Sequence, residues 1–447
     1  MLGCKAEKNI IFTKEISQKR KTNKRIMRIL PSTYFTYKNN QLYCEDVAVA
    51  EIIKQTGTPL YIYSKHYFEH AYKDFEAAFH SIPHKIFYAA KSNFNLSVIK
   101  TFLQLGSGVD VNSEGELYRA LKAGAKPDKI ILTSVGKTRR EIELGLEHDV
   151  LMIKAESEEE IYLINEIAVS MNKIARVAIR VNPDVDAKTH PYISTGLSEN
   201  KFGVDSETAL KIFRMQSELK NIKFVGIDMH IGSQITTIPP FVEAVEKLAN
   251  LFFILKKEGI ELKHFDVGGG IGIQYKDEKT FSMKEFAEAI LPTLISLNCE
   301  IIFEPGRFLT ANAGVLATEV LYTKKNQNKN FIVVDAAMTD LLRPSIYGAY
   351  HHVQPVTLDE TRKEIVADVV GPVCESGDFL AKERTIQKSE HGELLAVMST
   401  GAYGMVMASN YNARRRPAEI LVDGNTFKII RARETFEQLL WDEENYL

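Results

Sequence analysis

The sequence is poor in the features that mark membrane, secreted and metal-binding proteins. Its 447 residues include only four cysteines, no two of them in a CxxC pair, and a single tryptophan. It has no run of about 18 apolar residues, so no transmembrane helix is expected. Widely spaced cysteines are typical of reduced intracellular proteins rather than of disulfide scaffolds or zinc sites. These absences predict a cytoplasmic protein that is not bound to a membrane.

An excess of charge of one sign is also lacking. The chain carries 56 basic and 58 acidic side chains, which gives a formal net charge of −2. This balance argues against nucleic acid as a partner, because nucleic-acid-binding proteins present a strongly basic surface. The sequence contains no HxH or HExxH pair, so no metal site is expected. The composition is that of an ordinary globular protein.

The first 26 residues differ from the rest of the chain. They are rich in Lys and Arg but lack the apolar core of a signal peptide. We therefore expect residues 1–26 to be a disordered or non-native extension without a catalytic role. A chain of 447 residues is long for a single core, and the remainder is expected to form two domains.

Between residues 60 and 310, short runs rich in β-branched and aromatic residues alternate with longer amphipathic stretches. This alternation is typical of β/α units and a parallel sheet. Eight parallel strands with intervening helices close naturally into a (β/α)8 barrel, the TIM-barrel architecture. The expected strands cover residues 85–90, 108–111, 129–134, 151–155, 177–181, 224–231, 264–269 and 301–305.

The pattern changes after residue 310. Short strand-like runs separated by polar turns predict a second, mostly antiparallel β domain over residues 311–447, which ends in a helix. The segment 27–59 is strand-like in places and is expected to pair with this second sheet.

The expected barrel makes a prediction about where chemistry occurs. In such barrels the reactive groups lie at the C-terminal ends of the strands. Those ends are unusually dense in ionisable side chains and glycines here, which favours an active site over ordinary loops. They carry Lys91, Asp110 with Ser113, Arg180 with Asn182, His230 with Ser233, the run Gly268, Gly269 and Gly270, and Glu304 with Arg307.

Two of these strand-end motifs have simple alternatives. Taken alone, Lys91 in YAAKSN would be interpreted as a surface lysine. A desolvated lysine, by contrast, readily forms a Schiff base. DVGGGIGI at 266–273 is not a dinucleotide fingerprint, because Ile273 stands where that motif requires glycine. Its three consecutive glycines suit a phosphate, although a tight turn would explain them as well.

Other motifs are weak when taken singly. EPGR at 304–307 could be a surface ion pair, and the histidine of HIGSQ at 230–234 could be structural. Cys374 in CESGD could be a buried free cysteine. RPSIYGAYH at 343–351 and GAYG at 401–404 contribute an arginine and tyrosines in loops of the second domain.

Taken in order, these seven motifs resemble the fold-type III pyridoxal-phosphate decarboxylases over residues 32–440. The resemblance implies pyridoxal 5'-phosphate as cofactor and a homodimer with shared active sites. It implies that Lys91, His230 and Cys374 are catalytic, with Cys374 as a proton donor delivered across the dimer interface. It assigns the cofactor to Lys91, His230, Ser233, Gly268, Gly269, Gly270, Glu304, Pro305, Gly306, Arg307 and Tyr403, and the substrate to Arg307, Arg343, Tyr347, Glu375 and Tyr403. Asp110 and Glu116 are expected nearby.

The residue chemistry agrees with this resemblance. A glutamate beside the pyridine nitrogen keeps that nitrogen protonated, and a protonated ring is the electron sink that decarboxylation needs. Two arginines suit a substrate with a second, distal carboxylate and would repel an amine. The resemblance, with which these features agree, implies decarboxylation of meso-2,6-diaminopimelate to L-lysine and CO2. A decarboxylase of carboxynorspermidine, arginine or ornithine, or a cofactor-binding relative without catalysis, remains open.

Overall fold

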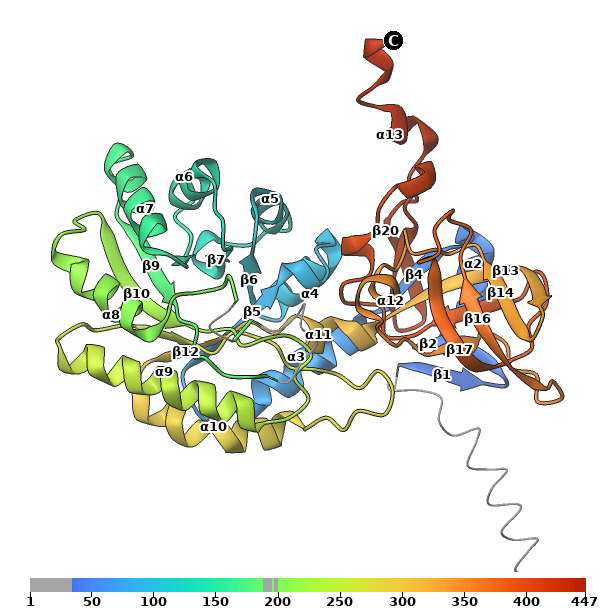
Figure 1. The fold of residues 1–447 in the computed structure, drawn as a ribbon, viewed down its shortest axis with the longest axis horizontal. Helices are drawn as coiled ribbons and strands as arrows, with labels where there is room; N and C mark the ends of the chain where they lie inside the picture. Colours follow the sequence, from blue (N-terminus) through green and yellow to red (C-terminus); the bar gives the residue numbers. More distant parts are fainter. Residues whose placement is uncertain (1–33, 188–194, 197–199) are drawn as a thin grey trace, which may run out of the picture.

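The computed structural model describes residues 34–187, 195–196 and 200–447, and the predicted extension at residues 1–26 lies outside this range. Figure 1 shows two parts that lie side by side. One is a barrel of strands surrounded by helices, and the other is built mainly from strands. No helix among the described residues is long and apolar enough to cross a membrane.

All eight predicted barrel strands form, and they close into a parallel barrel. β12 pairs with β5, which joins the last strand of the barrel to the first. The predicted (β/α)8 architecture is therefore confirmed. The strands are β5 His84–Ala89, β6 Gly108–Val111, β7 Ile130–Leu132, β8 Met152–Ala155, β9 Ala175–Arg180, β10 Ile222–Asp228, β11 His264–Asp266 and β12 Glu300–Phe303.

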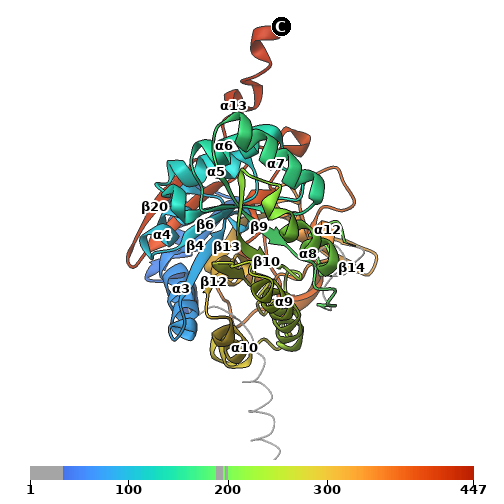
Figure 2. The same ribbon diagram turned by 90° about the vertical axis from the view of Figure 1, so that its left-hand side faces the viewer.

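Helices cover the outside of the barrel, as Figure 2 shows. Local signals fix several of their ends: Thr138 and Ser282 each form a capping box at the start of a helix. The helices are α3 Lys65–Phe79, α4 Leu96–Gln104, α5 Glu114–Lys122, α6 Arg139–Glu147, α7 Glu158–Ser170, α8 Ser206–Arg214, α9 Pro239–Lys257 and α10 Met283–Leu297.

The interior of the barrel has an apolar layer below a polar one. A buried cluster that includes Met152 and Ile302 fills the lower layer. Side chains two residues apart on a strand share a face, so Lys154 and Glu304 belong to the layer above. The change from apolar to charged side chains occurs toward the C-terminal ends of the strands, where sites in this fold lie.

The second part contains a nine-stranded, mostly antiparallel sheet, as predicted. β4 Leu60–Ser64 also lies in this sheet, where it pairs with β13 and β19. The other strands are β13 Gly314–Asn326, β14 Lys329–Val334, β15 Val353–Pro355, β16 Glu364–Val370, β17 Phe379–Gln387, β18 Leu394–Val397, β19 Ala418–Asp423 and β20 Thr426–Arg431.

The segment before β4 forms a small antiparallel sheet of β1 Phe35–Lys38, β2 Gln41–Cys44 and β3 Val47–Ala48, followed by α2 Val49–Thr56. It contacts the second part, because the Leu42 N–H donates to the Val356 carbonyl at 2.8 Å. At the other end of the chain, α13 Phe436–Leu440 begins at a capping box on Thr435.

Candidate active site

A cavity of about 280 Å³ lies at the C-terminal ends of the barrel strands, where the second part covers them. It is the point at which seven of the predicted site residues meet. Its lining consists of Lys91, Asn112, Ser134, Val135, Glu156, Arg180, Thr195, Phe202, His230, Ser233, Arg307, Arg343, Tyr347 and Tyr403.

A second hollow of about 290 Å³ lies near the opposite ends of the strands and is lined in part by Lys173 and Arg176. Both cations donate to backbone carbonyls, those of Glu147 and Leu151 among them. Because these charges are already engaged, the hollow offers no comparable chemistry, and we assign the site to the first cavity.

Lys91 lies in a single helical turn, η1 Ala90–Ser92, directly after β5. Its Nζ is 4.0 Å from Asp110 Oδ2, and its side chain is 37% exposed where it lines the cavity. Burial alone would lower the pKa of Lys91, but Asp110, Tyr403 and Glu304 raise it above the usual value. The other oxygen of Asp110 accepts from Thr133 Oγ1 at 2.6 Å, which fixes the carboxylate. The amine is thus held as a cation on the cavity wall.

His230 follows β10 and presents an uncharged ring to the cavity. Its Nδ1 accepts from the Gly269 N–H at 3.2 Å. Burial, together with the charges of Lys91, Arg180 and Lys154, lowers the pKa of His230 well below its usual value. The imidazole is therefore neutral, and it offers a flat face rather than a charge.

The run Gly268–Gly270 follows β11 where two strand ends approach closely. A Cβ on Gly269 would lie 2.2 Å from the Glu304 carbonyl oxygen, and Gly270 has a φ of +103°. Only glycine fits such positions without displacing the neighbouring backbone. The EPGR motif packs against the segment that carries Lys91. Pro305 O accepts from the Ala89 N–H at 3.2 Å, and a Cβ on Gly306 would lie 3.1 Å from Ser92 Cβ.

Arg307 begins the short helix α11 Arg307–Thr310 and lines the cavity. Its Nη1 donates to the Tyr275 hydroxyl at 2.8 Å, and its Nη2 donates to Ser233 Oγ at 3.0 Å. The guanidinium also lies over the Tyr403 ring, 4.7 Å from its centre. Its buried Nε has no hydrogen-bond partner among the described residues. The group is oriented by its neighbours and keeps donor capacity.

Arg343 begins α12 Arg343–Tyr347 and approaches the same cavity from the second part. Its Nη1 is 2.7 Å from His351 Nε2, and His351 Nδ1 is 2.8 Å from the Met398 carbonyl. Burial and the charge of Arg343 lower the pKa of His351 well below its usual value. A neutral His351 donates to Met398 and accepts from Arg343. It therefore orients the arginine without neutralising its charge.

Two tyrosines complete the wall. Tyr347 ends α12, and Tyr403 lies in the GAYG turn. Tyr403 has a φ of 55°, in the left-handed region that bulky residues rarely adopt. Its N–H donates to the Ser92 carbonyl at 2.8 Å, which ties this turn to the segment that carries Lys91. Backbone strain of this kind is concentrated at functional sites.

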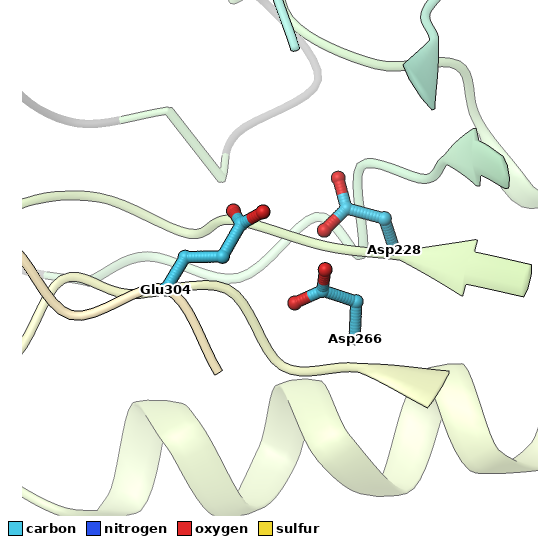
Figure 3. Close-up of side chains that lie close together, drawn as sticks. All are labelled: Asp228, Asp266 and Glu304. Carbon is cyan, nitrogen blue, oxygen red and sulfur yellow. The ribbon is translucent and has the colours of Figure 1, made fainter. Parts of the chain in front are cut away.

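Glu304 follows β12 and contacts a buried lysine that was not predicted as part of the site. Lys154 Nζ donates to Glu304 Oε1 at 2.5 Å, and it lies 2.8 Å from Asp228 Oδ1 and 2.7 Å from Asp266 Oδ2. Figure 3 shows the three carboxylates, which converge from the ends of β10, β11 and β12. The ammonium lies where a cation among these carboxylates would bind.

This cluster contains more acid than base. Burial raises the pKa of Glu304, Asp110 and Asp266 raise it further, and Lys154 only partly opposes them. Burial likewise raises the pKa of Asp228 to about 6. Burial alone would lower the pKa of Lys154, but the surrounding carboxylates raise it well above its usual value. Lys154 is therefore charged, and three acids share one ammonium.

Cys374 and Glu375 lie in the loop after β16 and do not line the cavity described above. Cys374 is exposed, and its N–H donates to Asn412 Oδ1 at 3.0 Å. Glu375 is also exposed, and its Oε1 accepts from the Gly377 N–H at 3.2 Å. A single chain therefore does not place these two predicted residues with the others.

Sequence reasoning missed Tyr275, His351 and Lys154, which contact predicted site residues. His351 is part of the motif RPSIYGAYH and could have been found there. Lys154 interrupts an otherwise apolar strand, and a charged residue in such a position requires a partner. Tyr275 carries no comparable local signal.

Comparison with known proteins places this site in a family. Residues 65–311 match the family model of the pyridoxal-dependent decarboxylase, pyridoxal binding domain. A diaminopimelate decarboxylase of Aquifex aeolicus is 47% identical over 408 residues, covering 91% of this chain and 96% of the relative. One of Haemophilus influenzae is 46% identical over 407 residues, covering 91% of this chain and 98% of the relative.

A solved structure shows the same architecture. The crystal structure of diaminopimelate decarboxylase from Helicobacter pylori, complexed with L-lysine, superposes with a TM-score of 0.86 at 43% identity. The superposition covers 89% of this chain and 100% of that one.

Proposed function

Because the chain belongs to the pyridoxal-dependent decarboxylases, and within them to the diaminopimelate decarboxylases, we propose that its cavity performs their reaction as follows. The enzyme removes one carboxylate from meso-2,6-diaminopimelate and yields L-lysine and CO2, the last step of lysine biosynthesis. The observation that carries this proposal is that Lys91 shares one cavity with two arginines, Arg307 and Arg343.

The residues present fit pyridoxal phosphate. An amine matches the need of an aldehyde, and a neutral ring matches a flat pyridine ring. The two arginines, whose buried Nε atoms have no hydrogen-bond partner in the described part of the chain, match anionic groups. The glycine run, on which a Cβ would clash, suits a close approach of phosphate to backbone. When bound, pyridoxal phosphate supplies an electron sink for the electron pair that the departing carboxylate leaves behind.

Each part of the cofactor has residues of this chain to hold it. Lys91 would hold it covalently through its amine, His230 would lie against the ring, and Glu304 would bond the ring nitrogen. The phosphate would be held by Ser233, Gly268, Gly269, Gly270, Pro305, Gly306 and Arg307, with Tyr403 in contact with the cofactor.

The distal end of the substrate would bind between the two arginines. A planar guanidinium pairs with a carboxylate through two parallel hydrogen bonds, so Arg307 and Arg343 select a substrate with a second carboxylate. Tyr347, Tyr403 and Glu375 would complete substrate binding. An amine at this end, as in ornithine, would be repelled by both cations.

Cys374 would deliver the proton that replaces the lost carboxylate at the substrate Cα. Because Cys374 and Glu375 are exposed and lie outside their own cavity, they are available to the cavity of a second copy. We therefore propose a cytoplasmic homodimer in which each chain completes the active site of the other.

Substrate comparison tests the specificity. We expect kcat/KM for CO2 release from meso-2,6-diaminopimelate to exceed that from ornithine, arginine and carboxynorspermidine by about 10²-fold or more, since buried cations would be left unpaired by the wrong substrate. Arg343→Leu should raise KM for diaminopimelate. Faster CO2 release from ornithine would refute the assignment, and no turnover of any of these substrates would indicate a relative without catalysis.

Mixing two variants tests the shared site. Cys374→Ala should cut turnover while the cofactor stays bound, and Lys91→Ala should be inactive. If the sites are shared, equal mixing and reassociation should restore about a quarter of wild-type activity, because half of the dimers then contain one intact site. Unchanged turnover of Cys374→Ala would remove it from the proton-donor role, and a mixture without recovery would contradict the shared site.

A further inference from the structure

Lys154 is an unusual residue for the interior of a barrel. It lies within β8, its side chain is 0% exposed, and the apolar layer that contains Met152 lies directly below it. Burying an ammonium is costly unless it is paired and hydrogen-bonded. The contacts to Asp228, Asp266 and Glu304 meet that requirement. An apolar side chain at this position, however, would avoid the cost of burial without needing any carboxylate.

The contact with Glu304 is specific to one oxygen. Lys154 Nζ lies 2.5 Å from Oε1, the shortest of its three carboxylate contacts. A carboxylate whose one oxygen is fixed can present only the other to a further partner. Lys154 therefore determines the direction in which Glu304 presents its second oxygen, Oε2.

The charge balance of the cluster is a second reason to connect Lys154 with the state of Glu304. Other ionisable groups facing the cluster are engaged elsewhere: Arg180 Nη1 is 3.2 Å from Glu156, and Lys91 is 4.0 Å from Asp110. Without Lys154, three carboxylates would lie together in a buried site with no ammonium between them. Like charges so close cannot all stay ionised, and at least one would take up a proton.

We propose that Lys154 is a positioning residue for the cofactor: it orients Glu304 and favours the ionised form of this carboxylate, the form that the ring nitrogen needs. This inference rests on the proposed role of Glu304 in holding the cofactor. A protonated Glu304 would be a hydrogen-bond donor, and it would no longer favour a protonated ring nitrogen.

The test follows the pH dependence of cofactor binding rather than activity. Because Lys154 lowers the pKa of Glu304, Lys154→Gln should raise it. Glu304 then ionises only at a higher pH. The acidic limit of binding, which is the pH below which pyridoxal phosphate no longer binds, should therefore move up by about 1–3 pH units. Lys154→Arg should keep the wild-type limit.

Lys137→Met is the control: it removes another buried lysine, 2.7 Å from Glu160, and should leave the limit unchanged. The charged and titratable groups around the cluster are Lys91, Asp110, Arg180, Asp228, His230 and Asp266.

Two double variants separate a positioning role from a merely structural one. Lys154→Gln with Asp228→Asn removes one acid along with the cation, and it should move the limit back toward the wild-type value. In a Glu304→Gln background, Lys154→Gln should cause no further change in cofactor binding or in its pH dependence, because both changes act through the same carboxylate. A purely structural lysine would instead give additive losses in both cases.

The outcomes distinguish this inference from the proposed function. If Glu304→Gln binds the cofactor with unchanged affinity and pH dependence, the assigned role of Glu304 is wrong. If Glu304→Gln shifts binding but Lys154→Gln behaves as wild type, only the role of Lys154 is overturned. Loss of folded structure, by circular dichroism, in both Lys154→Gln and the variant with Asp228→Asn would also overturn it, since the lysine would then support the fold alone.

Discussion

The two ends of one pair of barrel strands carry the same residue types with opposite electrostatics. β5 and β12 are hydrogen-bonded neighbours. At their N-terminal ends Lys85 lies 2.9 Å from Glu300, and the neighbouring side chains of His264 and Lys85 lower the pKa of Glu300 to about 2. Just beyond their C-terminal ends lie Lys91 and Glu304, where burial raises the pKa of the glutamate instead.

The difference lies in the balance of charges and in burial. Glu300 has two basic neighbours and a side chain that is 28% exposed. Glu304 shares a single ammonium with two other acids inside the barrel. The first arrangement stabilises a charge, whereas the second leaves a carboxylate responsive to a new cationic partner. Perturbed ionisable groups of the second kind mark functional sites.

The largest expected effect compares the two lysines of this strand pair. Lys91→Ala should abolish decarboxylation, because the proposed covalent attachment of the cofactor requires this amine. Lys85→Ala should leave kcat/KM near the wild-type value. The measurements are CO2 release and the visible absorption of the bound cofactor. Full activity of Lys91→Ala would refute its assigned role. Equal losses of activity in Lys91→Ala and Lys85→Ala would show that the two ends of the strand pair do not differ in function.

A smaller effect is expected for the two glutamates. Glu304→Gln should lower kcat by about 10²-fold or more, as expected when an electrostatic partner of the reacting system is removed. Glu300→Gln, the same change at the start of the same strand, should leave kcat unchanged. Steady-state kinetics at a saturating concentration of cofactor separates this effect from weaker cofactor binding. A similar kcat for the two variants would contradict the comparison.

The smallest expected effect concerns stability. Because the pKa of Glu300 is lowered in the folded state, its contribution is complete above its usual pKa of 4.5 and is lost as the pH falls toward 2. Glu300→Gln should therefore cost about 1 kcal/mol near neutral pH, an amount reduced by the partial exposure of the pair. Denaturation midpoints should differ from the wild type at pH 7 and converge as the pH falls to about 2. A constant difference at both pH values would assign the loss to packing instead.

Most of the barrel could be predicted because its signals are local. Each strand is a short apolar run with a polar residue at its end or within two residues after it, so strand ends such as Lys91 and His230 could be identified from the sequence. The sheet to which a strand belongs is not a local property. β4 reads as an ordinary buried strand, yet it pairs with β13 and β19, and Tyr63 donates to Glu419 at 2.8 Å.

The partners of site residues were the least predictable part. Lys154 meets Asp228, Asp266 and Glu304 only because barrel closure brings β8, β10, β11 and β12 around one interior. The sequence shows a charged residue within, at the end of or directly after each of these strands, but not that these charges meet. Likewise, the orientation of Arg343 by His351 depends on the Met398 carbonyl, which is distant in sequence.

The pairing of β12 with β5 also has a consequence for the order of events during synthesis. The ribosome makes the segment that carries Lys91 early, but the neighbour that closes the barrel beside it emerges long afterwards. Until then the edge of β5 on that side lacks its partner strand, and the vitamin-derived aldehyde has no finished pocket to enter. We therefore expect pyridoxal phosphate to bind late in synthesis, and a product truncated before residue 300 to lack the visible absorption of the bound cofactor.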